Sequence, residues 1–253
     1  MFCSFSVAVF SVLAIGSAWC EASPDEKRWN FMDGPWVENE SRPPIPTWPD
    51  QFISDFHLYI KKYGEDFESK GAIIYDWTKR TFRGDFYDFC IPLIDTDQPT
   101  FNNFTCTFLA SEGNMYYVEH TSTKWNENEC CLFQGGLGAV SPDWMGVGQY
   151  NGTSIISGVD TDVWWFPGTN DAENDPCYGY WSATDDSKRP VQFFGLASSG
   201  RDGGAILDYY TFIPGEIPED IPMTKPNNKC DEECVALFGS SLIVGWPEWP
   251  YCQ

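Results

Sequence analysis

Residues 71–89 read GAIIYDWTKRTFRGDFYDF, and this stretch decides the fold class. Two runs rich in β-branched and aromatic residues, 71–77 and 80–89, flank the dipeptide Thr78-Lys79. Such runs favour extended strands, and a very short polar link between two of them is typical of a β-hairpin. The stretch therefore predicts two antiparallel strands joined by a tight turn.

The same pattern continues on both sides of this hairpin. Upstream, apolar Phe52, Phe56, Leu58 and Ile60 share one parity from residue 51 on, which favours a half-buried strand over a helix. Downstream, 103–110 and 114–120 flank Ser111-Glu112-Gly113 as a second hairpin. Further strands are expected at 153–167, 179–183, 189–197 and 205–212. Short strands separated by Gly, Asp and Pro turns indicate a mainly β protein with an antiparallel sheet or barrel.

The N-terminus indicates export. Residues 5–18 are apolar, end in small residues and are followed by charged ones. A run of this length is typical of a signal peptide, whereas a membrane-spanning helix needs about 20 residues. We expect a signal peptide over 1–20, with cleavage after Cys20 or Ala22; an uncleaved anchor is the alternative. The expected location is secreted, or in the lumen of the secretory pathway, with no transmembrane segment in the mature chain.

The cysteine count agrees with an oxidising compartment. Eight cysteines lie beyond the signal peptide, an even number that favours disulfides. Adjacent Cys130 and Cys131 point to opposite faces of a strand, so each is expected to reach a different element. The sequence does not choose the pairing. The disulfide candidates are Cys90, Cys106, Cys130, Cys131, Cys177, Cys230, Cys234 and Cys252.

Glycosylation sequons and the net charge further limit the compartment and the classes of partner that we expect. Asn39, Asn103 and Asn151 each begin an Asn-x-Ser/Thr sequon without proline, so we predict a glycoprotein. The formal net charge is −22. A field of that sign argues against nucleic acid or an anionic membrane as partner.

The chain divides into four expected parts. Residues 1–20 are the signal peptide, and 21–50 form a Pro-rich N-terminal arm. Residues 51–227 form the β domain, and 228–253 a C-terminal helix and tail pinned by disulfides. In the tail, an Asn cap before KCDEECVALF and Gly239 after it predict one short helix with Cys230 and Cys234 on one face.

Chemical motifs are scarce. The chain has two histidines, and no nucleophile elbow, zinc-protease helix or phosphate-binding loop is present. We therefore favour a binding protein over an enzyme, although the many carboxylates leave acid–base chemistry open. Asp171, Glu173 and Asp175 lie in an acidic cluster that can offer oxygen ligands to calcium. The cluster lacks the spacing of a calcium loop, and a solvated turn before Cys177 is the alternative.

Aromatic residues are abundant, at 17% of the chain. Several stand in adjacent pairs within expected strands, so each pair places one ring on either face of the sheet. A sheet with rings on both faces is either covered on both or leaves one face to hold an apolar ligand. The pairs are Tyr116-Tyr117, Trp164-Trp165, Phe193-Phe194 and Tyr209-Tyr210.

Five segments follow one another in the chain: GAIIYDWTKRTFRGDFYD, NMYYVEHTSTKWNENECCLF, GQYNGTSIISGVDTDVWWF, RPVQFF and EDIPMTKPNNKC. In this order they resemble segments of ependymin-related proteins, over about residues 46–230. RPVQFF with its preceding lysine, YDW and PTWPDQF are also similar to a family of uncharacterised plant secreted proteins. Residues 21–45 and 234–253 have no counterpart in the resemblance.

The resemblance implies a curved antiparallel half-barrel of about ten strands with short helices, like periplasmic lipoprotein carriers. It also implies disulfides at Cys90, at Cys130 or Cys131, and at Cys230, together with lipid and calcium binding. The resemblance does not carry the lining of the groove over residue by residue. From strand parity, the ligand-binding candidates are Tyr117, Trp165, Phe194 and Tyr209.

The sequence thus favours a secreted glycoprotein that binds a hydrophobic small molecule, lipid or fatty acid. One alternative is a carbohydrate-binding or carbohydrate-active protein, in which Trp164, Trp246 or Trp249 stacks on sugar rings beside carboxylates. Another is a structural surface or matrix component. A homodimer through a sheet face is compatible with the expected fold.

Overall fold

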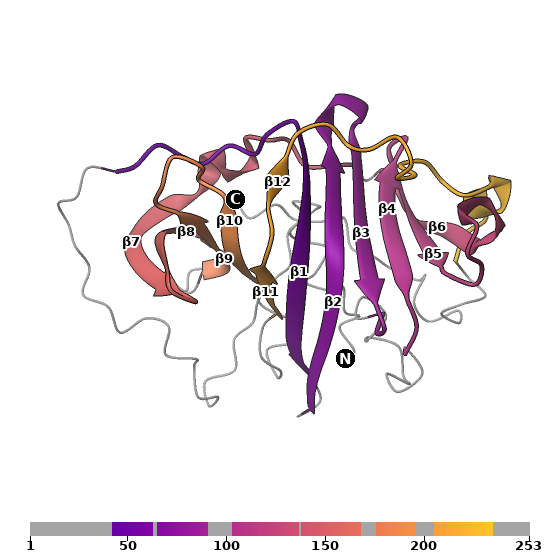
Figure 1. Cartoon of the computed structure of the whole chain (residues 1–253), viewed down its shortest axis with the longest axis horizontal. Helices are drawn as coiled ribbons and strands as arrows, with labels where there is room; N and C mark the ends of the chain where they lie inside the picture. The colour runs from indigo at the N-terminus through magenta and orange to yellow at the C-terminus, as the bar shows by residue number, and fades with distance from the viewer. Residues whose placement is uncertain are drawn as a thin grey trace.

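The computed structural model describes residues 42–62, 65–90, 103–136, 138–167, 176–195 and 205–234. In this part of the chain one curved, open antiparallel sheet of 12 strands dominates, as Figure 1 shows. The predicted mainly β, antiparallel fold class is confirmed. The sheet order is β6-β5-β4-β3-β2-β1-β11-β10-β9-β8-β7, and β12 pairs with β1.

The strands and short helices have the following bounds. The strands are β1 (Gln51–Lys62), β2 (Glu65–Asp76), β3 (Thr81–Tyr87), β4 (Cys106–Ser111), β5 (Asn114–Glu119), β6 (Glu129–Gly135), β7 (Gln149–Ile156), β8 (Val159–Pro167), β9 (Pro176–Ala183), β10 (Pro190–Gly195), β11 (Ala205–Tyr209) and β12 (Ile213–Pro214). The 3-10 helices are η1 (Trp77–Lys79), η4 (Trp125–Glu127), η5 (Trp144–Val147) and η6 (Asn228–Asp231). None of the helices in the described ranges has the length and apolar character needed to cross a membrane.

The hairpin predicted at 71–89 is formed by β2 and β3 around η1. Asp76 caps this turn, because its carboxylate accepts hydrogen bonds from the hydroxyl of Thr78 at 2.6 Å and the backbone N–H of Lys79 at 3.2 Å. Arg80 ends the turn in the left-handed region, with φ 56°, and its guanidinium lies over the Trp77 ring. The predicted hairpin of β4 and β5 is also present, with positive φ at Glu112 and Gly113.

Residues 153–167 form two strands rather than the single one expected. Ser157 and Gly158 adopt φ 51° and 80° and join β7 to β8 as a tight hairpin. A two-residue turn with positive φ at both positions matches the right-handed twist of the flanking strands. The dipeptide Ser157-Gly158 between Ile155-Ile156 and Val159 is the signal of this turn in the sequence. The strand β6 was not expected as a separate element either.

The main hydrophobic core lies on one face of the sheet, which we call the inner face. It is defined by buried residues from nearly every strand, among them Phe52, Phe56, Phe108, Tyr117 and Trp164. The opposite, outer face carries three smaller apolar clusters. Residues 42–50, at the end of the expected arm, belong to the core, because Trp48 is buried on the inner face.

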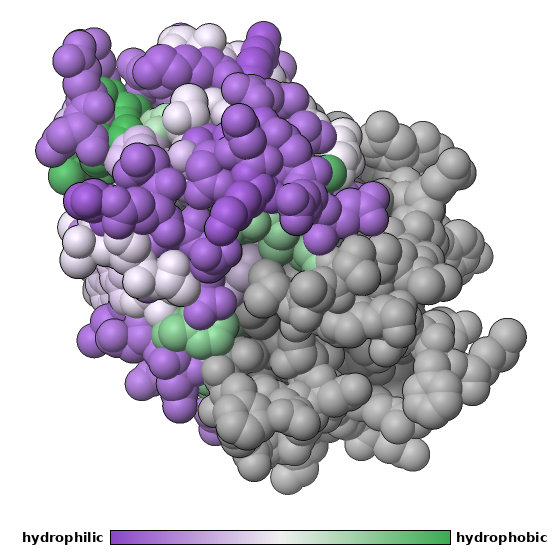
Figure 2. Space-filling view, turned by 90° about the vertical axis from the view of Figure 1, so that its right-hand side faces the viewer, coloured by the Kyte–Doolittle hydropathy of each residue, from purple (hydrophilic) through white to green (hydrophobic). Residues whose placement is uncertain are grey.

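The segment after β12 crosses to the β6 side of the sheet, where it ends in the yellow part of the chain (Figure 1). Ile217 and Met223 pack on Ala72 and Ile74 of the outer face. Beyond them, the backbone N–H of Leu132 on β6 donates to the carbonyl of Glu232 at 2.7 Å. The β6 edge of the sheet is thus paired, and Figure 2 shows a mainly hydrophilic described surface on this side. Pairing and polarity both protect a sheet edge from association.

The tail contains a shorter helix than expected. Asn227 caps it as predicted, accepting from the backbone N–H of Lys229 at 2.9 Å, but η6 ends at Asp231. Cys230 lies in η6 and bonds Cys130, whereas Cys234 follows the helix and bonds Cys131. The two cysteines therefore do not share a helix face. Adjacent Cys130 and Cys131 bond different partners, as expected, but both partners lie in this one segment.

Candidate ligand-binding face

Two cross-strand rows of apolar side chains form the middle of the inner face. Neighbouring residues in each row are paired across adjacent strands, which brings their β-carbons to about 5 Å. The first row is Trp164, Tyr180, Phe193, Leu207 and Leu58. The second row is Tyr209, Phe56, Gly71, Phe86 and Cys106.

Gly71 lets the second row remain continuous. A β-carbon at this position would overlap both the Phe56 ring and the carbonyl oxygen of Asp85. Without it, the Phe56 ring crosses β2 and meets Phe86 edge-on, with centroids 5.4 Å apart. Phe86 then approaches Phe108 at 6.3 Å, and Phe108 approaches Tyr117 at 5.5 Å. An aromatic surface therefore runs unbroken from β1 to β5.

One half of the inner face is covered by residues 42–50, through Trp48, and by η5, through Trp144. Trp48 packs edge-on against Phe52, Tyr75 and Trp144, with centroids 5.2 to 5.4 Å apart. Trp144 in η5 also stacks on Phe166 of β8 at 5.2 Å. The rings of the other half, from Phe86 to Tyr117, are buried as well, at 0 to 2% exposed, although no described helix or second sheet lies over them. A sheet must bury its apolar face against another layer or a ligand.

Polar atoms are few among the rings of the covered half. The indole N–H of Trp48 donates to the hydroxyl of Tyr180 at 3.0 Å, and the hydroxyl of Tyr75 donates to the carbonyl of Val140 at 2.7 Å. In contrast, Trp144 Nε1 and Tyr209 Oη have no hydrogen-bond partner in the described chain. These two residues are only 8% and 5% exposed. Leaving a buried donor unpaired costs about 1–3 kcal/mol.

Burial also sets the ionisation of the inner hydroxyls. The pKa of Tyr180 is raised well above its ordinary value, with burial as the cause. The pKa of Tyr209 is raised well above its ordinary value too, mainly by burial and additionally by the neighbouring Tyr180. Both hydroxyls thus stay protonated at neutral pH and remain able to donate.

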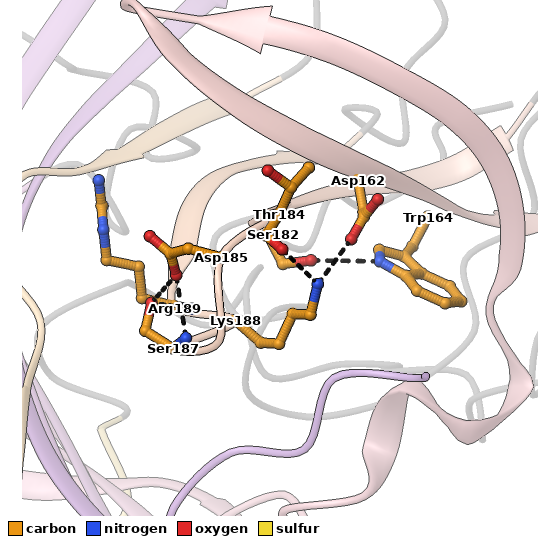
Figure 3. Close-up of polar contacts among 8 residues, drawn as sticks. All are labelled: Asp162, Trp164, Ser182, Thr184, Asp185, Ser187, Lys188 and Arg189. Atoms are coloured by element: carbon orange, nitrogen blue, oxygen red, sulfur yellow. Dashed lines mark hydrogen bonds and ion pairs between the residues drawn. The ribbon is translucent and has the colours of Figure 1, made fainter. Parts of the chain in front are cut away.

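An ion pair closes the rim of the inner face at the β9–β10 turn (Figure 3). Lys188 Nζ lies 3.1 Å from the buried carboxylate of Asp162 and donates to the carbonyl of Thr184 at 2.8 Å. The indole N–H of Trp164 donates to the Ser182 hydroxyl at 3.3 Å beside this pair. The charge of the buried Asp162 is thus compensated by that of Lys188.

A second polar group lies on the outer face of the central strands. His57 Nδ1 is 2.7 Å from the Tyr59 hydroxyl and 3.2 Å from that of Tyr210, and Nε2 is 3.2 Å from a carboxylate oxygen of Glu68. Tyr59 is partly exposed, and its pKa is raised to about 12, mainly by burial and by Tyr210. The group is a hydrogen-bonded surface cluster on β1, β2 and β11.

A third polar group is buried under the C-terminal segment. Asp85 Oδ1 accepts from Arg83 Nε at 2.8 Å and from the Thr107 hydroxyl at 2.5 Å. Because that hydroxyl donates to Asp85, its 2.7 Å contact with His120 Nε2 makes the imidazole the donor. The pKa of His120 is lowered, chiefly by burial; Asp85 opposes this shift and Arg83 adds to it. Arg83 also donates to the carbonyl of Pro222 at 2.8 Å, so the group ties the segment to the sheet.

The predicted ligand-binding residues divide between the two faces. Tyr117 and Tyr209 lie in the inner cluster. Trp165 and Phe194 lie on the outer face, packed against the cluster of Val163 and Trp181. The expectation that all four share one face is thus corrected. Their neighbours Trp164 and Phe193 face inward instead. Trp144, which carries an unpaired donor, was not singled out, and only its isolated position in a loop sequence distinguishes it.

The other predicted positions have the following outcomes. Cys90 bonds Cys106, so three disulfides join six of the eight predicted cysteines. The Cys177 side chain and Cys252 lie outside the described residues, as do Asn39 and the acidic residues Asp171, Glu173 and Asp175. Asn103 is exposed, and Asn151 is partly exposed on the edge strand β7. Within the described ranges no cluster of three metal-ligating side chains is present.

Comparison with known proteins gives a likeness in fold. No protein-family description and no curated protein matches the sequence. Among solved structures, an uncharacterised conserved protein from Thermus thermophilus has a TM-score of 0.41 at 10% identity, over 72% of this chain and 90% of its own. A LolA superfamily protein from Nitrosomonas europaea has a TM-score of 0.32 at 12% identity, over 72% and 93%. Lipoprotein LppX from Mycobacterium tuberculosis has a TM-score of 0.30 at 12% identity, over 68% and 90%.

Proposed function

We propose that this protein is a secreted glycoprotein that binds a hydrophobic ligand, such as a lipid or fatty acid, on the inner face of its sheet. The observation that carries the proposal is the continuous aromatic surface from Phe56 to Tyr117, whose rings are at most 2% exposed although no described helix or second sheet lies over the half from Phe86 to Tyr117. Rings packed edge to face form a large apolar surface that an acyl chain can follow.

The disulfides support the proposed location. Three of them are formed, and disulfides persist in oxidising compartments outside the cytosol. Cleavage of the signal peptide and glycans at Asn103 and Asn151 complete the proposal. Intact mass before and after removal of N-glycans tests these parts directly. An unmodified, full-length mass from a eukaryotic secretory host would contradict them.

Fluorescence quenching tests ligand binding and its place. Bromine atoms quench tryptophan by contact, so 9,10-dibromostearate or its methyl ester reports on nearby indoles. We expect quenching of the wild-type protein, and less of it in Trp164→Phe, which removes a buried indole of the inner face. The matched control is Trp125→Phe on the outer face, where the indole donates to the carbonyl of Thr224. Absence of quenching by both probes, or quenching that depends on Trp125, would overturn the proposal.

The carbohydrate-binding alternative required exposed tryptophans, and Trp164 is not one of them. Trp164 is fully buried in the inner cluster and does not belong to an exposed row of indoles. Trp246 and Trp249 lie outside the described residues. Nothing in the described chain favours this alternative over the apolar inner face.

Calcium binding at Asp171, Glu173 and Asp175 is a separate part of the proposal and comes from the sequence. Carboxylate oxygens are the ligands that calcium prefers. We expect millimolar Ca²⁺ to raise the Tm relative to EGTA, and the triple variant Asp171→Asn/Glu173→Gln/Asp175→Asn to abolish the difference. An equal Tm in Ca²⁺ and EGTA contradicts this part and leaves the apolar site untouched.

A further inference from the structure

Two buried hydrogen-bond donors of the inner cluster, Trp144 Nε1 and Tyr209 Oη, lack partners in the described chain, and Tyr180 belongs to the same cluster. The Trp144 ring meets the Tyr180 ring edge-on at 5.5 Å. The pKa of Tyr209 is raised mainly by burial and additionally by the electrostatic effect of Tyr180. The hydroxyl oxygen of Tyr180 accepts from the indole N–H of Trp48, and its own hydrogen remains free to donate. Trp144 Nε1 and Tyr209 Oη belong to the same cluster of rings and are the two donors in it that make no hydrogen bond at all in the described chain.

The other buried side-chain atoms without a hydrogen bond have different surroundings. His57 Nε2 faces Glu68 at 3.2 Å, and Asp76 Oδ2 faces Lys79 at 3.3 Å, so both have a charged neighbour. Gln134 Oε1 lies on β6, at the far edge of the sheet. In the described part of the chain, only Trp144 Nε1 and Tyr209 Oη combine unused donors with the aromatic surface of the proposed site.

We propose that Trp144 Nε1 and Tyr209 Oη donate hydrogen bonds to the polar end of the bound amphiphile, and that this end is an uncharged acceptor such as an ester carbonyl. This inference rests on the proposed function and names the ligand class. An indole N–H can only donate, and a buried protonated phenol donates as well, so the site selects an acceptor.

The charges around the two donors favour a neutral acceptor over a carboxylate. Burying a carboxylate without a cation is strongly unfavourable. Two cationic groups border the inner face in the described chain. Lys188 at the rim is paired with Asp162. Arg42 lies over the Trp164 ring, 5.6 Å from its centroid, but this residue is exposed and donates to the carbonyl of Gly148. An ester or ketone oxygen accepts both hydrogen bonds without bringing a charge into the site.

The test compares 9,10-dibromostearate with its methyl ester at pH 8, because the two share one acyl chain and differ in head-group charge. We expect the ester to reach half-maximal quenching at a concentration about tenfold lower. Tyr209→Phe removes one hydroxyl and keeps the ring, so it should abolish most of this preference. The ligand-free Tyr209→Phe protein should be at least as stable as wild type in urea, because the hydroxyl it loses is unpaired.

The matched control is Tyr116→Phe, the same change at a buried tyrosine of the outer face, and it should keep the preference of the wild type. Equal quenching by acid and ester, or a preference that survives Tyr209→Phe, overturns this inference while the proposed function stands. A clear loss of stability in ligand-free Tyr209→Phe also overturns it, because the hydroxyl would then serve the fold, for example through a resident water. Failure of both probes to quench the wild type overturns the proposed function itself.

Discussion

The ring of Phe56 on β1 occupies the space above Gly71 on β2 and reaches Phe86 on β3, with the two ring centroids 5.4 Å apart. A glycine inside a strand weakens it locally, since it offers no side chain to pack. Here the ring of a neighbouring strand fills the gap. The contact joins three strands of the inner face and makes Gly71 a position where any side chain is excluded.

Gly71→Ala is therefore expected to destabilise the protein by about 3 kcal/mol or to prevent folding. The added β-carbon would overlap a backbone carbonyl, which cannot move without breaking the β2–β3 ladder. Urea unfolding followed by circular dichroism measures the loss. Gly138→Ala is the control, because a β-carbon there meets no atom within 4 Å. Equal stability of the two variants would contradict the role given to Gly71.

The ion pair between Lys188 and Asp162 should be revealed by a double-mutant cycle. Lys188→Met leaves the buried Asp162 carboxylate without its partner, at a cost of about 1–3 kcal/mol because the lysine is partly exposed. Asp162→Asn removes the charge, so adding Lys188→Met to it should cost less than about 0.5 kcal/mol. Urea unfolding of the four proteins gives the coupling energy. A coupling energy near zero would show that the pair does not stabilise the rim.

The stability of the protein should fall between pH 7 and pH 5 because of His120. Its pKa is lowered in the folded state by burial, so the unfolded chain takes up this proton first as the pH decreases. The stabilisation is fully present above the ordinary histidine pKa of about 6.5 and is lost as the pH falls toward the lower folded value. The midpoint of urea unfolding at pH 7 and pH 5 measures the effect. His120→Gln, which can still donate but does not titrate in this range, should show a smaller decrease; an unchanged decrease would exclude His120 as its source.

The two disulfides of the C-terminal segment should be strongly non-additive. Cys130–Cys230 and Cys131–Cys234 span 100 and 103 residues, so each closes nearly the same loop. Once one is formed, the other constrains only a few residues. Replacing either pair by alanine should cost about 2 kcal/mol, and replacing both should cost more than about 5 kcal/mol. Additive losses in urea unfolding would mean that the segment is held chiefly by other contacts, such as that of Arg83 with Pro222.

Much of the strand pattern was readable from local alternation. Phe52, Phe56, Leu58 and Ile60 lie on the inner face as their shared parity predicts. Each of the four aromatic pairs places one ring on either face, also as predicted. Local patterns suffice in these cases because side chains alternate strictly along a strand.

Which ring of a pair faces inward depends on the partner strands. The β9–β10 pairing shifts by one residue between Pro190 and Gln192, and the β7–β8 pairing shifts between Tyr150 and Thr153. A slip of one residue exchanges the two faces of a strand. Parity along each strand gives the alternation but not which face is inward, so Tyr117 and Tyr209 were assigned correctly to the inner face and Trp165 and Phe194 were misplaced.

The sequence by itself determined the fold class, most strands and the cap of the last helix, because alternation, turn residues and caps act over a few neighbouring positions. Only the tertiary structure decided which cysteines pair, how Phe56 spans Gly71, and that Trp144 Nε1 and Tyr209 Oη are buried in one cluster without hydrogen-bond partners in the described chain. Most of these features join residues that are tens of positions or more apart in the chain. They follow from strand order and register, which are set by the packing of the whole sheet and leave no local trace in the chain.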